Sequence, residues 1–485
     1  MIGLNFKHTF WPSLNINNGW LNAKFHLMSV CLSYNQLKTL HGKVSLSTDL
    51  NGYNLLINDL QLDYIIVNKN LESFETRFNS FWVLKKLYSL AQENKPFLNV
   101  DCDFYFFKKL EQKFSTCSLI AQNYEFDHPY YIDTFNIVND NFAYVPDYLK
   151  KEPNGRVSAI NAGVIGGTNT EFFKIVFNEV RIFIKKNQAS FLKFKNVDFN
   201  MFLEQFFIKK LSEEEGIGIT YLKEEEVGYP IDYSLDKFYN LPNEADYLHT
   251  MNYKTNPLIC EQIAQRLYLE NPILYYRCIE VSKNYPDNEK KKVGHFNRLK
   301  KIQKYIIDNE VPPSKSLKPQ LDDLESFEFQ IKKSNTIFNS FDWEQNSISA
   351  NKLLSLPKLE YLKVGVKQSA YFKLILSDWD WSKKNHFKNQ TSENKYFENL
   401  NIPPSYFEVL LFYLKNQDVV SEYLADPADM FIFEKTIDFI SMENLIEEIF
   451  SEINTYQPEL DYDLFSSIVL SRIKIFIYLG LFQFE

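Results

Sequence analysis

The stretch Pro96-Phe97-Leu98-Asn99-Val100-Asp101-Cys102-Asp103-Phe104-Tyr105-Phe106 decides how this chain can fold. An apolar run leads into two carboxylates separated by one residue, and a second apolar run follows. If the backbone stays extended, Asp101 and Asp103 project to the same side, because side chains alternate along a strand. Two oxygen ligands at the end of a buried strand suit Mg²⁺ or Mn²⁺. A short polar loop is the alternative interpretation of the same D-x-D pattern.

Length and composition narrow the class of protein. A chain of 485 residues predicts two or three domains. The formal net charge of −9 argues against a protein that holds nucleic acid through phosphate contacts. Five cysteines without a C-x-x-C predict neither a zinc site nor a disulfide framework, which fits a reducing compartment. The start lacks a signal-peptide layout, and no apolar run reaches the roughly 20 residues of a membrane helix. We therefore expect a cytoplasmic protein without a transmembrane segment.

Alternating periodicity in the first half predicts an α/β fold. Strand-like runs over residues 44–49, 64–67, 96–100 and 117–122 alternate with helix-like runs over 21–40, 54–60 and 75–92. This order predicts a Rossmann-type, mostly parallel sheet with flanking helices. Ligands of such sheets bind outside the carboxyl ends of the strands. Thr48-Asp49 and Asp101-x-Asp103 end two predicted strands, so we expect them to face one crevice.

Further candidate residues follow along the chain. The small residues of Asn161-Ala162-Gly163 allow a ligand to approach the backbone, although a tight strand is the alternative. Glu204 interrupts a strongly apolar helix pattern, so it is either a buried carboxylate that needs a partner or a residue on an exposed face. His249 is a suitable metal ligand, and Lys254 a suitable phosphate contact.

Taken together, these stretches resemble the GT-A nucleotide-sugar glycosyltransferases, and in particular a poorly characterised bacterial GT-A-type family. The resemblance spans about residues 5–275. It rests on the order and spacing of Phe10-Trp11, Asn18-Gly19-Trp20, Ser47-Thr48-Asp49-x-x-Gly52, the D-x-D stretch, Asn161-Ala162-Gly163-Val164-Ile165-Gly166-Gly167, Asn200 with Glu204-Gln205, and His249 with Lys254.

The resemblance implies a role for each candidate. Asp101, Asp103 and His249 would hold Mn²⁺ or Mg²⁺ on the donor diphosphate, which Lys254 would also contact. Thr48 and Asp49 would lie near the nucleotide, and Asn161, Ala162 and Gly163 near the donor sugar and the acceptor. Glu204 and Asn161 are the candidate catalytic residues, with Glu204 as the base that an inverting enzyme would need.

The implied activity is that of a metal-dependent hexosyltransferase. Its donor would be a nucleotide sugar, with UDP as the expected nucleotide, and its acceptor a glycan, a peptide or a small molecule. One alternative is a GT-A-like binding or scaffold protein without activity. A nucleotidyltransferase is a second alternative, disfavoured because the N-terminal part lacks a Gly-rich, basic nucleotide loop.

The second half predicts a separate unit. We expect a catalytic domain over residues 1–281, a linker rich in proline and lysine over 282–320, and an α-rich accessory domain over 321–485. Within the last domain, residues 429–485 predict a strand pair over 429–438, two helices and a final strand. That order is faintly similar to a winged-helix module, which some peptide-modifying enzymes use to capture a leader peptide. The alternative is a helical appendage that packs on the catalytic domain or mediates homo-oligomerisation.

Overall fold

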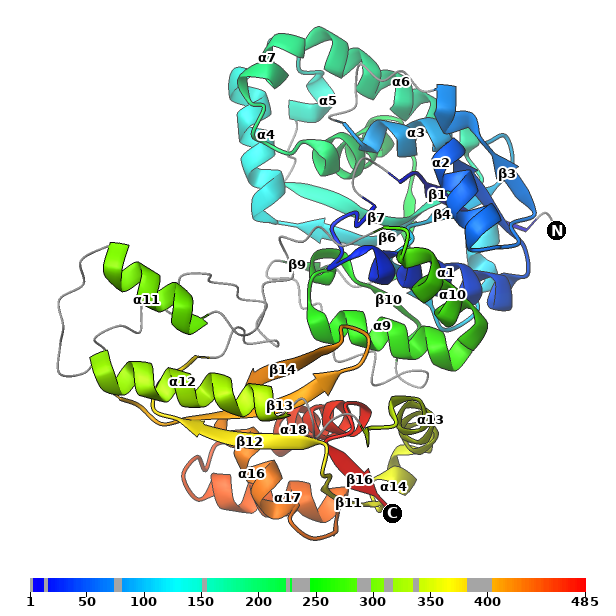
Figure 1. The fold of residues 1–485 in the computed structure, drawn as a ribbon. Helices are drawn as coiled ribbons and strands as arrows, with labels where there is room; N and C mark the ends of the chain where they lie inside the picture. The colour runs from blue at the N-terminus through cyan, green and yellow to red at the C-terminus, as the bar shows by residue number, and fades with distance from the viewer. Residues whose placement is uncertain are drawn as a thin grey trace.

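The computed structural model describes residues 3–12, 16–73, 81–150, 155–223, 227–228, 245–285, 298–308, 317–334, 340–381 and 404–485. Two parts are visible in Figure 1, one built on a large sheet and one formed by the second half of the chain.

The large sheet is mostly parallel. Its strand order is β3-β2-β1-β4-β7-β6-β8, and β9 also pairs with β6. The strands are β1 (Asn5–Phe10), β2 (Val44–Thr48), β3 (Ile66–Asn68), β4 (Phe97–Val100), β6 (Leu119–Phe126), β7 (Ser158–Gly167), β8 (Ile219–Tyr221) and β9 (Val227–Gly228). Only β7 runs antiparallel to its neighbours, β4 and β6, within the described strands of this sheet. The expected α/β class with a mostly parallel sheet is therefore confirmed.

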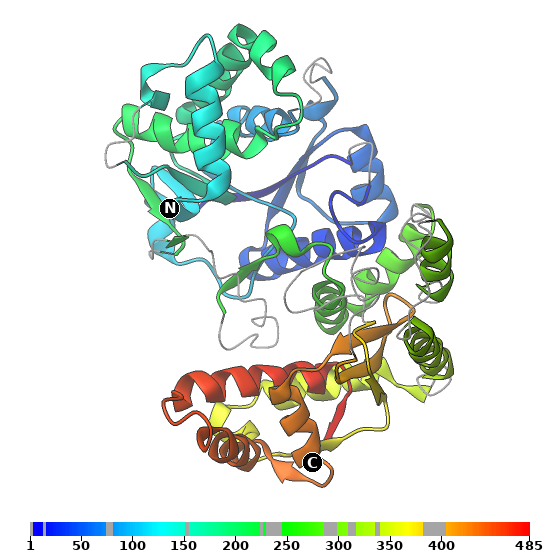
Figure 2. The same ribbon diagram turned by 90° about the vertical axis from the view of Figure 1, so that its left-hand side faces the viewer.

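Helices cover both faces of this sheet, as Figures 1 and 2 show. One core includes α3 (Val83–Ala91), α6 (Thr170–Lys186) and α8 (Phe207–Glu214), and the other includes α1 (Ala23–His41), α9 (Pro257–Glu270) and α10 (Pro272–Ser282). Strand β4 contributes to both, because Phe97 joins the first core while Leu98 and Val100 join the second. Burial on both faces explains why the strand reads as an apolar run.

Shorter elements complete this part. They are α2 (Leu50–Tyr53), α4 (Pro129–Asn141), α5 (Asp147–Lys150), α7 (Gln188–Lys193), π-helices over Asn54–Asp59 and Phe202–Phe206, 3-10 turns over Asn70–Ser73, Gln112–Thr116 and Met251–Tyr253, and the strands β5 (Phe104–Phe106) and β10 (Tyr247–His249). The helices expected over residues 21–40 and 54–60 correspond to α1 and to the π-helix Asn54–Asp59 within a few residues. The helix expected over residues 75–92 is described only from Val83, since residues 74–80 lie outside the described ranges.

The second part is mainly helical, as expected, and also contains two three-stranded sheets of orders β12-β13-β14 and β15-β11-β16. Its helices are α11 (Arg298–Asp308), α12 (Leu317–Ser334), α13 (Trp343–Leu354), α14 (Lys358–Tyr361), α16 (Pro427–Lys435), α17 (Met442–Asn454) and α18 (Tyr462–Tyr478). Its strands are β11 (Gly365–Gln368), β12 (Phe372–Ser377), β13 (Phe407–Leu414), β14 (Val419–Leu424), β15 (Ile440–Ser441) and β16 (Phe482–Phe484).

The strand pair predicted over residues 429–438 is wrong, because α16 occupies most of that stretch. Asp426 accepts a hydrogen bond from the amide of Asp429 at 3.0 Å, and Asp429 accepts one from the amide of Asp426 at 3.1 Å. This capping box, with Pro427 at the first helical position, is a strong helix start that overrides the β-like apolar residues after it. The segment expected as a linker contains a basic helix, α11, and the start of α12.

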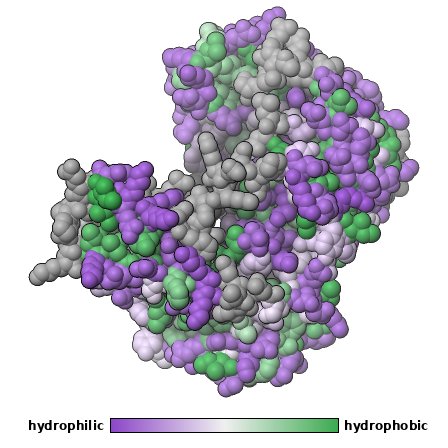
Figure 3. Space-filling model, viewed as in Figure 1, coloured by the Kyte–Doolittle hydropathy of each residue, from purple (hydrophilic) through white to green (hydrophobic). Residues whose placement is uncertain are grey.

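One face of the molecule shows how polar and apolar side chains are distributed over its surface. The face drawn in Figure 3 carries mostly hydrophilic side chains, with hydrophobic ones in small separate groups. Among the described residues, none of the helices combines the length and apolar character that crossing a membrane requires.

A buried carboxylate lies where the two parts meet. Glu261 of α9 is 2% exposed and accepts a hydrogen bond from the side chain of Asn416, in the β13–β14 turn, at 2.8 Å. Burial raises the pKa of Glu261 to about 7, although the bonds from Asn416 and the charge of Lys24 oppose that rise. The folded chain therefore binds a proton on Glu261 more tightly than the unfolded chain does.

We expect this proton to make stability depend on pH. Because the pKa of Glu261 is higher in the folded state, its stabilising contribution is complete below about pH 4.5 and is lost as the pH rises to about 7. The loss is about 3 kcal/mol. Urea unfolding of the wild type and of Glu261→Gln at pH 5, 6, 7 and 8 should show the variant gaining relative to the wild type with increasing pH. Parallel curves for the two proteins would contradict this.

Candidate functional site

The two aspartates of the D-x-D stretch lie in a tight turn at the end of β4. The amide of Phe104 donates to the carbonyl of Asp101 at 3.0 Å, so the backbone turns here instead of staying extended. Two serines of α1 hold this turn from below, since Ser29 Oγ donates to the carbonyl of Cys102 and Ser33 Oγ to that of Phe104, each at 2.7 Å. The carboxylates thus converge through a braced turn and not through the alternation of a strand.

His249 joins the two aspartates because β10 pairs antiparallel with β5, which places His249 opposite Phe104. Ligand atoms of Asp101, Asp103 and His249 all lie within 4.8 Å of one another. The Nδ1 atom of His249 is 2.8 Å from Oε1 of Gln122, so Nδ1 donates its proton to that amide oxygen. The Nε2 atom faces Asp103, whose Oδ1 lies 3.5 Å away.

Lys254 completes the group from the segment before α9. Its Nζ lies 2.8 Å from Oδ2 of Asp103. Burial raises the pKa of Asp103, but the charges of Lys254 and His249 outweigh burial and hold that pKa well below its usual range. Asp103 therefore stays ionised at neutral pH, as a metal ligand must.

The donor set fits a divalent metal. Carboxylate oxygens and one imidazole nitrogen suit Mn²⁺, and the carboxylates also suit Mg²⁺. Among the described residues, this is the one group of three or more such side chains close enough to share an ion. Asp101 remains partly open, with one third of its side chain exposed, so a phosphate can approach from solvent.

Gly163 lets His249 approach the sheet. A Cβ atom at this position would lie 2.4 Å from Cε1 of His249 and 2.5 Å from Oε1 of Gln122. The group that approaches this backbone closely in the structure is the histidine of the metal group, and the approach of a ligand to the stretch stays a prediction. Asn161 lies beside it on β7, where its Oδ1 accepts from the amide of Gly163 at 3.0 Å. The fully buried Ala162 contributes its carbonyl to the site.

Asn161 also leads to a carboxylate that the sequence patterns did not single out. Its Nδ2 donates to Oε1 of Glu125 at 2.9 Å and lies 3.3 Å from the sulfur of Met251. Glu125 is 3% exposed and comes from β6, the strand that also carries Gln122. Both polar residues interrupt a strand-like apolar run, which is the signal that could have identified them.

Glu204 is buried, at 1% exposure, so its alternative placement on an exposed face is excluded. It lies in the π-helix Phe202–Phe206, a deviation that often accompanies functional sites. Its carboxylate is 2.9 Å from Nζ of Lys86, which in turn lies 2.7 Å from Oδ1 of Asp101. Burial raises the pKa of Glu204, while Lys86 opposes that rise.

Lys86 is the main residue that sequence reasoning missed. It bridges Asp101, Glu204 and the carbonyl of Ala162, which it reaches at 2.9 Å. Burial acts to lower its pKa, but the two carboxylates overcome burial and raise that pKa above the usual lysine value. Helical spacing from Val83 and Leu90 puts Lys86 on the apolar face of α3, which is the signal that could have revealed it.

Replacing Lys86 by Met should destabilise the protein by about 3–5 kcal/mol, because Glu204 would be left as an unpaired buried charge. The double variant Lys86→Met with Glu204→Gln should recover most of that loss. Lys85→Met is the matched control. Lys85 is more exposed than Lys86, and its weak ion pair with Asp49 is 3.9 Å long, so its replacement should lower stability by less than about 1 kcal/mol. Equal urea midpoints for Lys86→Met and the wild type would refute the bridging role.

Thr48 and Asp49 lie at the same edge of the sheet as Asp101 and Asp103, because β2 and β4 both run parallel to β1. Asp49 caps α2, with Oδ1 accepting from the amide of Gly52 at 2.8 Å. A Cβ atom on Gly52 would lie 2.1 Å from the hydroxyl of Thr48, so this glycine is needed for packing. Thr48 is itself fully buried, which leaves Asp49 as the more accessible member of the pair.

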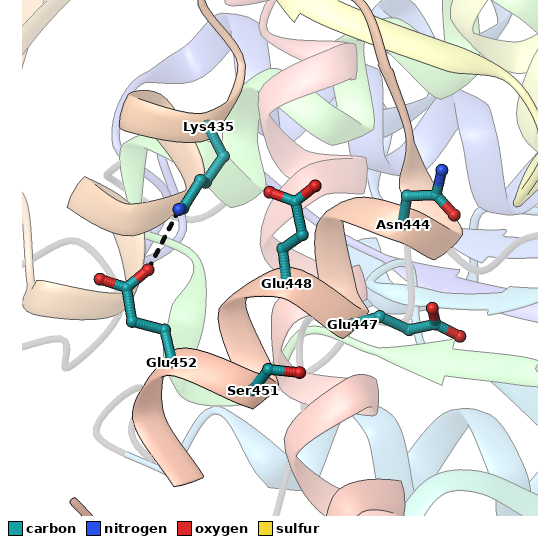
Figure 4. Close-up of a pocket in the computed structure, with 6 residues that line it drawn as sticks. All are labelled: Lys435, Asn444, Glu447, Glu448, Ser451 and Glu452. Carbon is teal, nitrogen blue, oxygen red and sulfur yellow. Dashed lines mark ion pairs between the residues drawn. The ribbon is translucent and has the colours of Figure 1, made fainter. Parts of the chain in front are cut away.

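An open depression of about 560 Å³ lies elsewhere, on the helices α16 and α17. Figure 4 shows its lining residues, Lys435, Asn444, Glu447, Glu448, Ser451 and Glu452, with an ion pair between Lys435 and Glu452. It contains none of the candidate residues. Lys435 comes from α16, and the other five residues, three of them glutamates, come from α17; most of the six are exposed. Its chemistry is therefore that of a solvated surface.

Comparisons with known proteins place the first part of the chain in a family. No curated protein matches the chain. Among solved structures, mouse xyloside xylosyltransferase 1 in its apo form aligns with 45% of this chain and 85% of its own, at 12% identity and a TM-score of 0.29. The galactosyltransferase LgtC in complex with donor and acceptor sugar analogues aligns with 60% of this chain and 100% of its own, at 11% identity and a TM-score of 0.29. The family described as a family of unknown function (DUF6734) matches residues 4–281, more than half of the chain, and the protein therefore belongs to that family.

Proposed function

We propose that this protein transfers a hexose from a nucleotide sugar, with UDP as the nucleotide, to an acceptor hydroxyl with the help of Mn²⁺ or Mg²⁺. The observation that carries the proposal is the convergence of Asp101, Asp103 and His249 at the carboxyl edge of a mostly parallel sheet. Lys254 adds a cation next to Asp103, which would favour the binding of the donor diphosphate at this site. Oxygen-rich metal groups of this kind characteristically bind phosphates.

Each residue of the site has a part in this proposal. Asp101, Asp103 and His249 would hold the metal, which when bound supplies Lewis-acid stabilisation of the departing diphosphate. Lys254 would contact the diphosphate and stabilise its developing charge. Asp49 lies at the same edge as the metal group, where the nucleotide would extend. Lys86 keeps Asp101 in place and neutralises Glu204.

Two carboxylates are candidates for contact with the acceptor or the sugar. Glu204 is paired with Lys86, so it supports the site through that lysine and becomes a base only if the pair opens. Glu125 is held by Asn161, which gives a carboxylate and an amide together on neighbouring strands. Asn161 would therefore position Glu125 as well as face the donor sugar.

The test is a screen of nucleotide sugars by mass spectrometry, with Mn²⁺, Mg²⁺ or EDTA present. Slow hydrolysis of one nucleotide sugar, lost on addition of EDTA, is the expected result. Turnover that EDTA leaves unchanged would overturn the metal-dependent mechanism. Binding of the nucleotide without any turnover, in the presence of candidate acceptors, would favour the alternative of an inactive scaffold.

A further inference from the structure

The turn between β13 and β14 reaches into the sheet-containing part of the chain. Figure 1 shows this hairpin rising from the second part to α9, and Figure 2 shows the same approach from the side. Asn416 lies at its tip and is 4% exposed. A polar side chain buried so deeply at the junction of two parts needs hydrogen-bond partners from the opposite surface.

Three helices of the first part supply those partners. Glu261 of α9 accepts from the amide of Asn416, with each carboxylate oxygen at 3.3 Å, and from its side chain at 2.8 Å. The hydroxyl of Tyr275, on α10, donates to Oδ1 of Asn416 at 2.6 Å. Lys24, in the first turn of α1, donates to the carbonyl of Asn416. All polar atoms of this asparagine are thereby used in the contact.

A neighbouring bond extends the contact to the start of α9. The side chain of Gln417 donates to the carbonyl of Pro257, the first residue of α9, at 2.9 Å. The hairpin tip thus joins the first turn of α1 to the first turns of α9. Through this hairpin, the starts of α1 and α9 are connected by the hydrogen bonds of Asn416 and Gln417.

Lys254 lies between the same two helix starts. Its carbonyl accepts from the amide of Leu21, just before α1, at 3.0 Å, and from the thiol of Cys260, in α9, at 3.3 Å. Its side chain then runs to Asp103, with Nζ at 2.8 Å. The position of this ammonium group therefore depends on how α1 and α9 are held relative to each other.

We propose that Asn416 is a positioning residue for the donor site, and that the β13–β14 hairpin aligns Lys254 with the metal group by clamping the starts of α1 and α9. This inference rests on the proposed function, since it assigns Lys254 to the donor diphosphate. The second half of the chain then forms part of the catalytic unit, although it lies outside the matched family region.

The test compares Asn416→Ala with Thr436→Val in the full-length chain. Thr436 is a matched control because it is fully buried in the second part, and its hydroxyl donates to the carbonyls of Ile432 and Phe433 in α16, away from the junction with the first part. We expect Asn416→Ala to weaken UDP binding in the presence of Mn²⁺ by about tenfold, as for residues that orient ligand-binding groups. Thr436→Val should leave UDP affinity within about twofold at a similar loss of stability, of about 1 kcal/mol.

A charge-preserving exchange separates positioning from general destabilisation. Asn416→Asp combined with Glu261→Gln keeps the net charge and reverses the direction of the side-chain bond, so it should restore UDP affinity to within about threefold of the wild type. If the wild type binds UDP and Mn²⁺ and Asn416→Ala binds UDP equally well, the positioning role of Asn416 is wrong while the proposed function stands. A wild type that binds neither would instead overturn the proposed function.

Discussion

Replacing Asp103 by Asn is expected to abolish Mn²⁺-dependent binding of UDP. Asp103 is the most enclosed member of the metal group, and Lys254 and His249 keep its carboxylate ionised. The carboxylate offers the metal two charged oxygens, whereas the amide offers one neutral oxygen. Replacing residues that only support metal ligands lowers metal affinity by up to about 100-fold, so replacing a ligand itself should lower the affinity at least about 100-fold. Titration of Mn²⁺ followed by electron paramagnetic resonance, with and without UDP, measures this.

The matched control is Asp246→Asn. Asp246 precedes β10 by one residue, is exposed and pairs with Lys108, so it shares the neighbourhood without belonging to the metal group. Its replacement should leave Mn²⁺ affinity unchanged. A variant Asp103→Asn that keeps wild-type affinity for both Mn²⁺ and UDP would rule out the proposed metal site. The Asp103→Asn variant should remain folded, because the oxygen of the new side-chain amide can still accept a hydrogen bond from Lys254.

Replacing Gly163 by Ala should have the second largest effect. The new methyl group would meet Cε1 of His249 at 2.4 Å and Oε1 of Gln122 at 2.5 Å, so the imidazole must move away from the two aspartates. A displacement of about 1 Å in a positioned group can cost about 100-fold in activity. Overpacking at this buried strand should also cost about 1–3 kcal/mol of stability. Mn²⁺ affinity, turnover and urea unfolding should be measured on the same preparation.

Gly218→Ala provides the comparison for this variant. A Cβ atom there has no neighbour within 4 Å, and Gly218 directly precedes β8 at the edge of the same sheet. We expect its Mn²⁺ affinity and stability to match the wild type. If Gly163→Ala behaves in the same way, the close approach of His249 to β7 is not required for the site, and the role given to the Asn161-Ala162-Gly163 stretch is wrong.

The sequence was most informative where a local pattern has a local cause. The alternation of strand-like and helix-like runs predicted the α/β class, because strands buried along their whole length, such as β4 and β7, carry mostly apolar or small residues. The predicted strand pair over residues 429–438 failed for an equally local reason. The Asp426–Asp429 capping box begins a helix, and this start signal outweighs the β-like side chains that follow it.

Partners far apart in the sequence could not be predicted in this way. Lys86 meets Asp101 and Glu204 only because α3 and the π-helix Phe202–Phe206 pack on the same face of the sheet. Gln122 meets His249 across 127 positions of the chain. Such contacts depend on topology, and a single sequence carries no periodic signal for them.

The sequence by itself determined which side chains have the chemistry of metal ligands, and that Asp101 and Asp103 follow a strand of a mostly parallel sheet, because residue chemistry and periodicity are local properties. Only the tertiary structure decided how they meet. It replaced the extended D-x-D by a turn braced from α1, oriented His249 through Gln122, and placed Asn416 between the starts of α1 and α9. Each of these contacts joins segments that only the packed fold brings within hydrogen-bonding distance.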